Sequence, residues 1–138
     1  MRHGEPTFVD SGAWIALALS EDPLHAAARE QLELLRSAAA KLHTSIPVII
    51  ETFTFLDRNT SRDVALAWKE GVYKPGVVKI LGCELRDLDQ AWEFFRRTDL
   101  RKLSAVDATS FAIMKRARIR VAFTFDYHFA MVGFRPVA

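Results

Sequence analysis

Short apolar runs with a preference for β structure alternate along the chain with longer stretches of helical spacing. Strand patterns are centred on residues 7–9, 77–81 and 121–125 and, more weakly, on 43–45 and 134–137. Helical patterns occupy residues 13–19, 23–40, 47–56, 61–70, 87–97 and 104–118. This alternation predicts an α/β fold in which helices cover a mainly parallel sheet.

Polar residues beside these patterns predict the ends of the helices. The pair Asp22-Pro23 is typical of a helix start, with the aspartate as N-cap. Asp87, followed by a glutamine three residues later, predicts a capping box at the start of another helix. Ser61 is expected to cap a further helix, which Gly71 should end at about residue 70.

The chain has 138 residues, half of them hydrophobic and 26% charged. This length suffices for a hydrophobic core, so residues 1–138 are expected to form a single domain. The lone cysteine, Cys83, excludes an internal disulfide and a cysteine-rich zinc site, and it fits a reducing compartment. The apolar run 13–19 is far shorter than the roughly 18 residues of a membrane span, so we expect a cytoplasmic protein that does not enter membranes.

Charge is distributed unevenly, although the formal net charge is only +2. Residues 1–57 carry a net charge of −4 and residues 58–138 a net charge of +6. Basic residues cluster at 96–102 and 115–120, and such clusters can bind a polyanion such as RNA. The alternative is that they are solvated helix ends, where the helix dipole favours cations. The candidate RNA-binding residues are Arg96, Arg97, Arg101, Lys102, Lys115 and Arg116.

Four acidic residues fall where the predicted fold would bring them together. Asp10 and Asp126 follow the carboxyl ends of two predicted strands. Glu51 and Asp107 lie near the starts of two predicted helices. A helix that follows a parallel strand begins at the carboxyl edge of the sheet, which is where α/β folds place their functional sites. We therefore expect all four acids to converge on one rim.

Each acid also has a local explanation. Asp10 and Asp126 could cap a helix or a turn, and Asp107 could form a capping box with Ser104. Glu51 could be an exposed helix residue. These explanations do not account for four acids at sheet-edge positions. Because clustered carboxylates repel one another, a divalent cation is the obvious compensation. Mg²⁺ or Mn²⁺ prefers oxygen ligands and can activate water for attack on a phosphoryl group.

Other chemistries have less support in the sequence. The chain contains no glycine-rich phosphate-binding motif, no Cys/His spacing of a zinc site and no G-x-S-x-G elbow. His128 is the only histidine near a proposed site residue, and a hydrogen-bonded structural role is favoured over a role as ligand or proton carrier. The hydroxyl residues beside the acids are expected to orient carboxylates or to cap helices, and they are Ser11, Ser104 and Thr124.

The motifs around the four acids resemble those of PIN-domain ribonucleases. They are FVDSGA at 8–13, the helix of Glu51, LSAVDATSFA at 103–112 and FTFDYHF at 123–129. The similarity extends over nearly the whole chain, with the acids in the order found in the family, and it is greatest to the VapC toxins of type II toxin–antitoxin modules. The resemblance implies a PIN-like three-layer α/β/α fold with a mainly parallel central sheet.

The resemblance also implies an activity and partners. The protein would be a Mg²⁺- or Mn²⁺-dependent endoribonuclease that cuts single-stranded RNA. Asp10 and Asp107 would be the main metal ligands, and Asp126 would complete the pocket. Glu51 would bind metal or position the attacking water. The implied partners are a VapB-like antitoxin, which covers the site, and a second copy of the chain in a homodimer.

Two alternatives stay open at this point. The PIN fold could serve as an RNA- or protein-binding module that binds without turnover and without metal. A PIN nuclease could also act in RNA processing outside a toxin–antitoxin system. A metal-dependent phosphatase is less favoured, because Asp10 is followed by Ser11 and Gly12 and not by a second aspartate two residues later.

Overall fold

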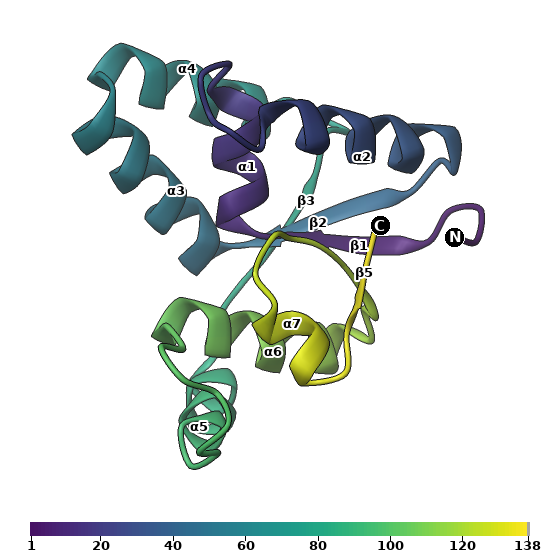
Figure 1. Cartoon of the computed structure of the whole chain (residues 1–138), viewed down its shortest axis with the longest axis vertical. Helices are drawn as coiled ribbons and strands as arrows, with labels where there is room; N and C mark the ends of the chain where they lie inside the picture. The colour runs from purple at the N-terminus through teal and green to yellow at the C-terminus, as the bar shows by residue number, and fades with distance from the viewer. Residues whose placement is uncertain (138) are drawn as a thin grey trace.

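The computed structural model describes residues 1–137 and contains one five-stranded sheet with helices on both faces (Figure 1). The strands are β1 (Pro6–Val9), β2 (Lys41–Ser45), β3 (Lys79–Leu81), β4 (Val121–Phe123) and β5 (Arg135–Pro136). The helices are α1 (Ser11–Ala18), α2 (His25–Ser37), α3 (Ile46–Asn59), α4 (Arg62–Tyr73), α5 (Leu85–Phe94), α6 (Ala105–Ala117) and α7 (His128–Met131). The predicted α/β class is confirmed.

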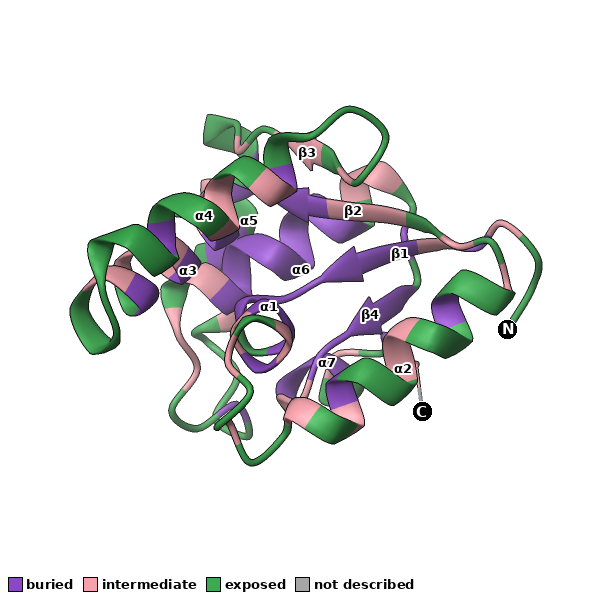
Figure 2. Ribbon diagram, turned by 90° about the horizontal axis from the view of Figure 1, so that it is seen from above, coloured by how far each residue is buried: buried purple, intermediate pink, exposed green. Residues whose placement is uncertain are grey.

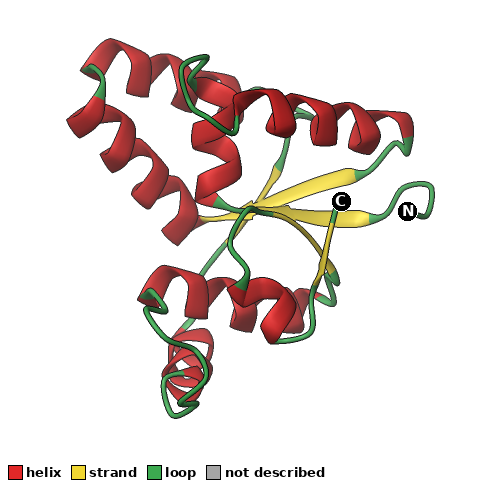
Figure 3. Cartoon of the chain, viewed as in Figure 1, coloured by secondary structure: helices red, strands yellow, loops and turns green. Residues whose placement is uncertain are grey.

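All strand pairs are parallel, in the order β3-β2-β1-β4-β5. Figure 3 shows α1, α2 and α4 on one side of the sheet and α5, α6 and α7 on the other, with α3 beside its end. This is the expected three-layer α/β/α arrangement. Because the strands are parallel, their carboxyl ends meet at a single edge, and the helices that follow them start there.

The core lies around the two central strands, β1 and β4, which Figure 2 shows as largely buried. Phe8 and Phe123 from these strands have no exposed surface. Phe111 of α6 and Phe129 of α7 pack edge to face with ring centroids 4.9 Å apart, and both are also fully buried. This apolar packing holds the short helix α7, and with it the chain that follows β4, against the sheet.

The start of α2 differs from the prediction. Asp22 does not cap the helix: its carboxylate accepts a hydrogen bond from the backbone N–H of Leu24 at 2.8 Å and closes a turn. The helix therefore begins three residues later, at His25. It ends at Ser37 and not at residue 40, because Ala39 adopts a left-handed backbone conformation with φ of 51°.

Three further helix boundaries were predicted wrongly, the end of α4 and both ends of α5. Gly71 does not end α4, which continues to Tyr73. The helix ends there because Pro75 forces the preceding residue, Lys74, into an extended conformation. The helix α5 begins at Leu85 with Glu84 as N-cap, and the Asp87 carboxylate accepts from the Glu84 backbone N–H at 2.8 Å. Asp87 is thus the third helical residue of the capping box and not its start, and the helix ends at residue 94 instead of 97.

Within residues 1–137, no helix is both long enough and apolar enough to span a membrane.

Candidate active site

Asp10 directly follows the central strand β1 and contacts the end of the neighbouring strand β4, at the carboxyl edge of the sheet. Its backbone N–H donates to the carbonyl of Phe123 at 3.0 Å, and its Oδ2 accepts from the Thr124 hydroxyl at 3.0 Å. The side chain is 3% exposed and makes no capping hydrogen bond to α1, so the local explanation of Asp10 as a helix cap is wrong. Its other oxygen, Oδ1, is buried and has no hydrogen-bond partner within residues 1–137.

Thr124 links Asp10 to Asp126. The register of β1 and β4 pairs Val9 with Phe123, which brings the next residues, Asp10 and Thr124, side by side. The Thr124 hydroxyl that donates to Asp10 also accepts from the backbone N–H of Asp126 at 3.0 Å. This contact replaces strand pairing, so β4 ends at Phe123 and not at residue 125 as predicted. Thr124 therefore orients two of the predicted acids.

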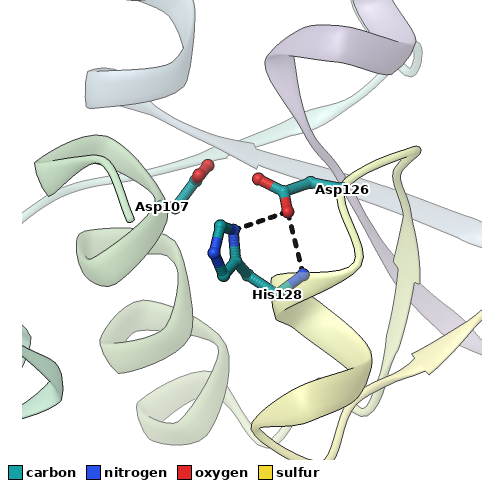
Figure 4. A group of neighbouring side chains, drawn as sticks. All are labelled: Asp107, Asp126 and His128. Atoms are coloured by element: carbon teal, nitrogen blue, oxygen red, sulfur yellow. Dashed lines mark hydrogen bonds and ion pairs between the residues drawn. The ribbon is translucent and has the colours of Figure 1, made fainter. Parts of the chain in front are cut away.

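Asp107 lies in the first turn of α6, on the opposite side of the site. The Ser104 side chain caps this helix by accepting from the backbone N–H of Asp107 at 3.0 Å, as expected for a supporting residue. Asp107 is 8% exposed. One carboxylate oxygen of Asp107, one of Asp126 and a ring nitrogen of His128 all lie within 4.8 Å of one another (Figure 4).

Glu51 approaches the site from α3. Its Oε1 accepts from the hydroxyl of Ser11, the first residue of α1, at 2.5 Å. The negative charge of Glu51 is close enough to contribute to the raised pKa of Asp10. The structure thus brings all four predicted acids to one end of the sheet, although they come from four different parts of the chain.

The ionisation of two of these acids is strongly disfavoured. Burial raises the pKa of Asp10 to about 7, and the negative charges of Glu51 and Asp126 add to this effect. The hydrogen bond from the Thr124 hydroxyl and the nearby backbone N–H of Ser11 favour the charged form and oppose this effect. Burial also raises the pKa of Asp107 to about 8, together with the charges of Asp10 and Asp126. A site with such acids gains stability from any positive charge placed among them.

His128 fixes the orientation of Asp126. Asp126 Oδ1 accepts from the His128 backbone N–H at 2.8 Å and lies 2.7 Å from its Nδ1, the two contacts drawn in Figure 4. The backbone contact closes a turn around Tyr127, so the local explanation of Asp126 as the cap of a short turn is correct. The other ring nitrogen, Nε2, lies 2.7 Å from the carbonyl oxygen of Arg101. The expected hydrogen-bonded structural role of His128 agrees with the Nε2 contact to this carbonyl.

Most of the candidate RNA-binding residues lie on the surface, and several have partners within the protein. Arg96 contacts Glu93 at 3.0 Å, and Arg97 contacts Asp99 at 2.7 Å. Lys115 lies over the ring of Phe94, with its nitrogen 5.1 Å from the centroid. Arg101 contributes its carbonyl to the His128 contact, and Lys102 adopts a positive φ of 58° in the same loop.

Arg116 is engaged inside the protein. Its guanidinium forms two hydrogen bonds of 2.9 Å to the Asp87 carboxylate and a third, of 3.1 Å, to the carbonyl of Gly82. Asp87 is only 2% exposed. Burial alone would raise the pKa of Asp87, but hydrogen bonding to Arg116 brings it below its ordinary value. Arg116 therefore fastens α6 to α5 and does not offer a free guanidinium to RNA.

Replacing Arg116 with methionine is expected to lower the free energy of unfolding by about 3–5 kcal/mol, because Asp87 would stay buried without its partner. Urea denaturation at pH 7 measures this loss. The matched control is Arg96→Met, which breaks an ion pair whose side chains are 79% and 67% exposed and should cost less than about 1 kcal/mol. Equal losses in the two variants would contradict a structural role for Arg116.

Comparison with known proteins places this geometry in a family. The model of the PIN domain family matches residues 7–135. The chain therefore belongs to the PIN domain family, as the resemblance of its motifs implied. It is 36% identical to the "23S rRNA-specific endonuclease VapC20" of Mycobacterium tuberculosis over 130 residues, which cover 94% of this chain and 96% of that protein.

Solved structures give the same result. The crystal structure of M. tuberculosis VapC20, described as a "Sarcin-Ricin loop cleaving toxin", superposes with a TM-score of 0.80 and 34% identity, and the match covers 93% of this chain and 95% of that one. The DNA-bound VapBC structure from Salmonella typhimurium has a chain that matches with a TM-score of 0.66 and 14% identity, covering 96% of both chains. At this low identity the second match supports the fold alone.

Sequence reasoning left out one part of this site. The short helix α7 was not predicted, because four residues carry too little periodicity to distinguish a helix from a turn. The available signal was the spacing of Asp126 and His128, which allows the aspartate to accept from the N–H two residues later.

Proposed function

We propose that this protein is a metal-dependent endoribonuclease and the toxin component of a VapBC-type toxin–antitoxin system. The observation that carries the proposal is the buried, unpartnered Oδ1 of Asp10 among the carboxylates of a PIN domain. The relative VapC20, named as a 23S rRNA-specific endonuclease, supports RNA as the substrate class and makes 23S rRNA the first candidate substrate.

The donor atoms fit a hard divalent cation. The acids supply carboxylate oxygens, and a cation among them would offset the burial and the mutual repulsion that raise the pKa values of Asp10 and Asp107. We assign Asp10, Asp107 and Asp126 as the residues that would hold Mg²⁺ or Mn²⁺. When bound, such an ion would neutralise these acids, polarise a phosphoryl oxygen and lower the pKa of water.

The remaining groups of the site orient the acids and the reactants. Thr124 occupies Oδ2 of Asp10, which leaves Oδ1 directed to the cation site. Ser11 occupies Oε1 of Glu51, and we assign Glu51 Oε2 to the attacking water, from which it would accept a hydrogen bond. His128 keeps Asp126 in place through the two contacts at Oδ1.

Tyr127 offers a surface for an RNA base beside these groups. Its side chain is 61% exposed although it follows Asp126 directly. Its ring packs against the ring of His128 in a tilted arrangement, with centroids 4.4 Å apart and planes inclined by 31°, which restricts the ring before substrate binds. Exposed aromatic rings of this kind stack on the bases of single-stranded nucleic acids.

The proposed partners follow from the VapC relationship. We propose that a VapB-like antitoxin binds the protein, that the protein forms a homodimer, and that it acts in the cytoplasm, where RNA is available. The support for these partners is the 36% identity to VapC20 over nearly the whole chain.

The proposal is tested by incubating the purified protein, freed of any antitoxin, with ribosomes and with total RNA in Mg²⁺, in Mn²⁺ and in EDTA. We expect discrete fragments in one or both metals and none in EDTA, because the carboxylates cannot bind an RNA phosphate without a cation between them. Primer extension along 23S rRNA then locates the cleavage site.

Two results would overturn the proposal. Fragments of equal intensity in EDTA would exclude the metal-dependent mechanism. RNA that stays intact in both metals, with protein whose folding is verified by circular dichroism and which binds RNA, would favour the alternative of a binding module without catalysis.

A further inference from the structure

A positively charged surface region lies away from the four acids of the candidate active site. A hollow of about 770 Å³ is formed between the N-terminal segment, the end of α6 and β5. Five cations and one acid line it: Arg2, Lys115, Arg118, Arg120, Arg135 and Glu5. We call this hollow the basic groove. The buried ring of Phe134 also lines it.

The basic groove has far more positive than negative charge. Its single carboxylate, Glu5, is 6% exposed and binds two of the arginines, Arg2 at 2.9 Å and Arg135 at 3.3 Å. Lys115, Arg118 and Arg120 have no acidic partner within ion-pair distance in the part of the chain that the structure describes. All three side chains are exposed. Lys115 also lies over the ring of Phe94, so Arg118 and Arg120 offer the charges that are most available to a ligand.

The basic groove and the acidic site lie at opposite ends of the sheet. Pairing of Thr7 with Val121 places the amino ends of β1 and β4 together, beside the groove, whereas Asp10 follows the carboxyl end of β1. The helix α6 joins the two regions, with Asp107 in its first turn and Arg118 as its C-cap. Eleven residues of helix separate them by about 16 Å. In Figure 1 the N-terminus lies at the groove end of the molecule.

We propose that the basic groove binds backbone phosphates of the RNA substrate at a distance from the bond that is cut. This inference rests on the proposed function, which makes RNA the substrate. The acidic site repels the RNA backbone, so affinity must come from cations elsewhere on the surface. Four of the five cations are arginines, whose planar guanidinium matches phosphate oxygens in pairs. The 16 Å span corresponds to about five stacked nucleotides of one strand.

The first test measures binding without cleavage. In protein carrying Asp107→Asn, the further substitutions Arg118→Gln and Arg120→Gln are introduced together, and the dissociation constant for a 5′-labelled RNA of roughly 30 nucleotides is measured over a range of KCl concentrations. We expect weaker binding and a salt dependence whose slope falls by about 1.4, since each lost phosphate contact on a single strand contributes about 0.7.

The matched control removes two positive charges elsewhere. Arg29→Gln and Arg58→Gln change exposed residues on α2 and α3 and should leave the slope as it is. An unchanged slope in the Arg118/Arg120 variant, or an equal change in the control, would overturn the proposal. If the variant loses affinity for poly-glutamate but not for RNA, the groove belongs to an acidic protein segment and the proposal is equally overturned.

The second test separates this inference from the proposed function. In otherwise wild-type protein, kcat/KM is compared for a cleaved RNA of about 20 nucleotides and for the six nucleotides centred on the cleaved bond. The short RNA extends only three nucleotides to either side of that bond, roughly 10 Å at 3.4 Å per nucleotide, and is too short to reach from the acids into the groove. The Arg118→Gln/Arg120→Gln variant should lose activity on the long RNA only. If wild-type protein cuts neither RNA, the proposed function fails, while the binding slopes still decide whether the groove holds RNA.

Discussion

Replacing Asp107 with asparagine is expected to lower RNA cleavage on the order of 10³-fold while leaving the chain folded. The substitution removes a negative charge where the acids would hold a cation, and the loss of several kcal/mol of transition-state stabilisation corresponds to such a factor. Asparagine has nearly the same shape, and it retains the backbone N–H that the Ser104 side chain caps. Initial rates on a cleaved RNA in Mg²⁺ measure the effect, and circular dichroism measures folding.

Asp89→Asn is the matched control for this experiment. Asp89 is an exposed residue of α5, so this variant makes the same replacement of a carboxylate by an amide outside the site. Its cleavage rate should equal that of the wild type. An Asp107→Asn rate within about tenfold of the wild type would contradict the assignment of Asp107 as a metal-holding residue, because that assignment requires a loss of several kcal/mol.

In the absence of divalent ions, the free energy of unfolding is expected to fall as the pH rises from about 4 to about 8. Burial raises the pKa of Asp10 from 3.8 in the unfolded chain to about 7. Between these values the folded state binds more protons than the unfolded state, so each increase in pH favours unfolding. For Asp10 alone the total effect is about 4 kcal/mol, and Asp107, with a pKa of about 8, acts in the same direction.

Urea denaturation in EDTA at several pH values between 4 and 8 tests this dependence. The Asp10→Asn variant should be more stable than the wild type at pH 8, and the difference should vanish near pH 4, where Asp10 is neutral in both states. Mg²⁺ should stabilise the wild type at pH 8 more than the variant, because it binds the ionised site of the folded protein. A difference of equal size at both pH values would show that ionisation of Asp10 is not its cause.

The order of the elements and the class of the fold could be predicted from the sequence, because they depend on local periodicity. Alternation of β-prone runs with helical spacing is a property of neighbouring residues, and parallel strands then force the carboxyl ends to one edge. The convergence of Asp10 with Glu51, Asp107 and Asp126 follows from this rule without knowledge of any distance.

Only the tertiary structure decided how individual polar side chains are used. From the sequence alone, Asp87 was predicted to start a helix, and Arg116 was one cation of a basic cluster. In the structure they form a buried ion pair between α5 and α6. Likewise, Arg2 joins Arg118, Arg120 and Arg135 in the basic groove although more than a hundred positions of the chain separate it from them.

The physical reason is the range over which each interaction acts. Hydrophobic spacing and turn chemistry are set within a few residues, so the chain itself specifies its helices, its strands and the positions of its four acids. Ion pairs, shared hydroxyl contacts and the pKa values they produce depend on which helices pack together and in which register. That is why the link from Asp10 through Thr124 to Asp126, and the positive charge gathered at the opposite end of the sheet, became visible only in the folded protein.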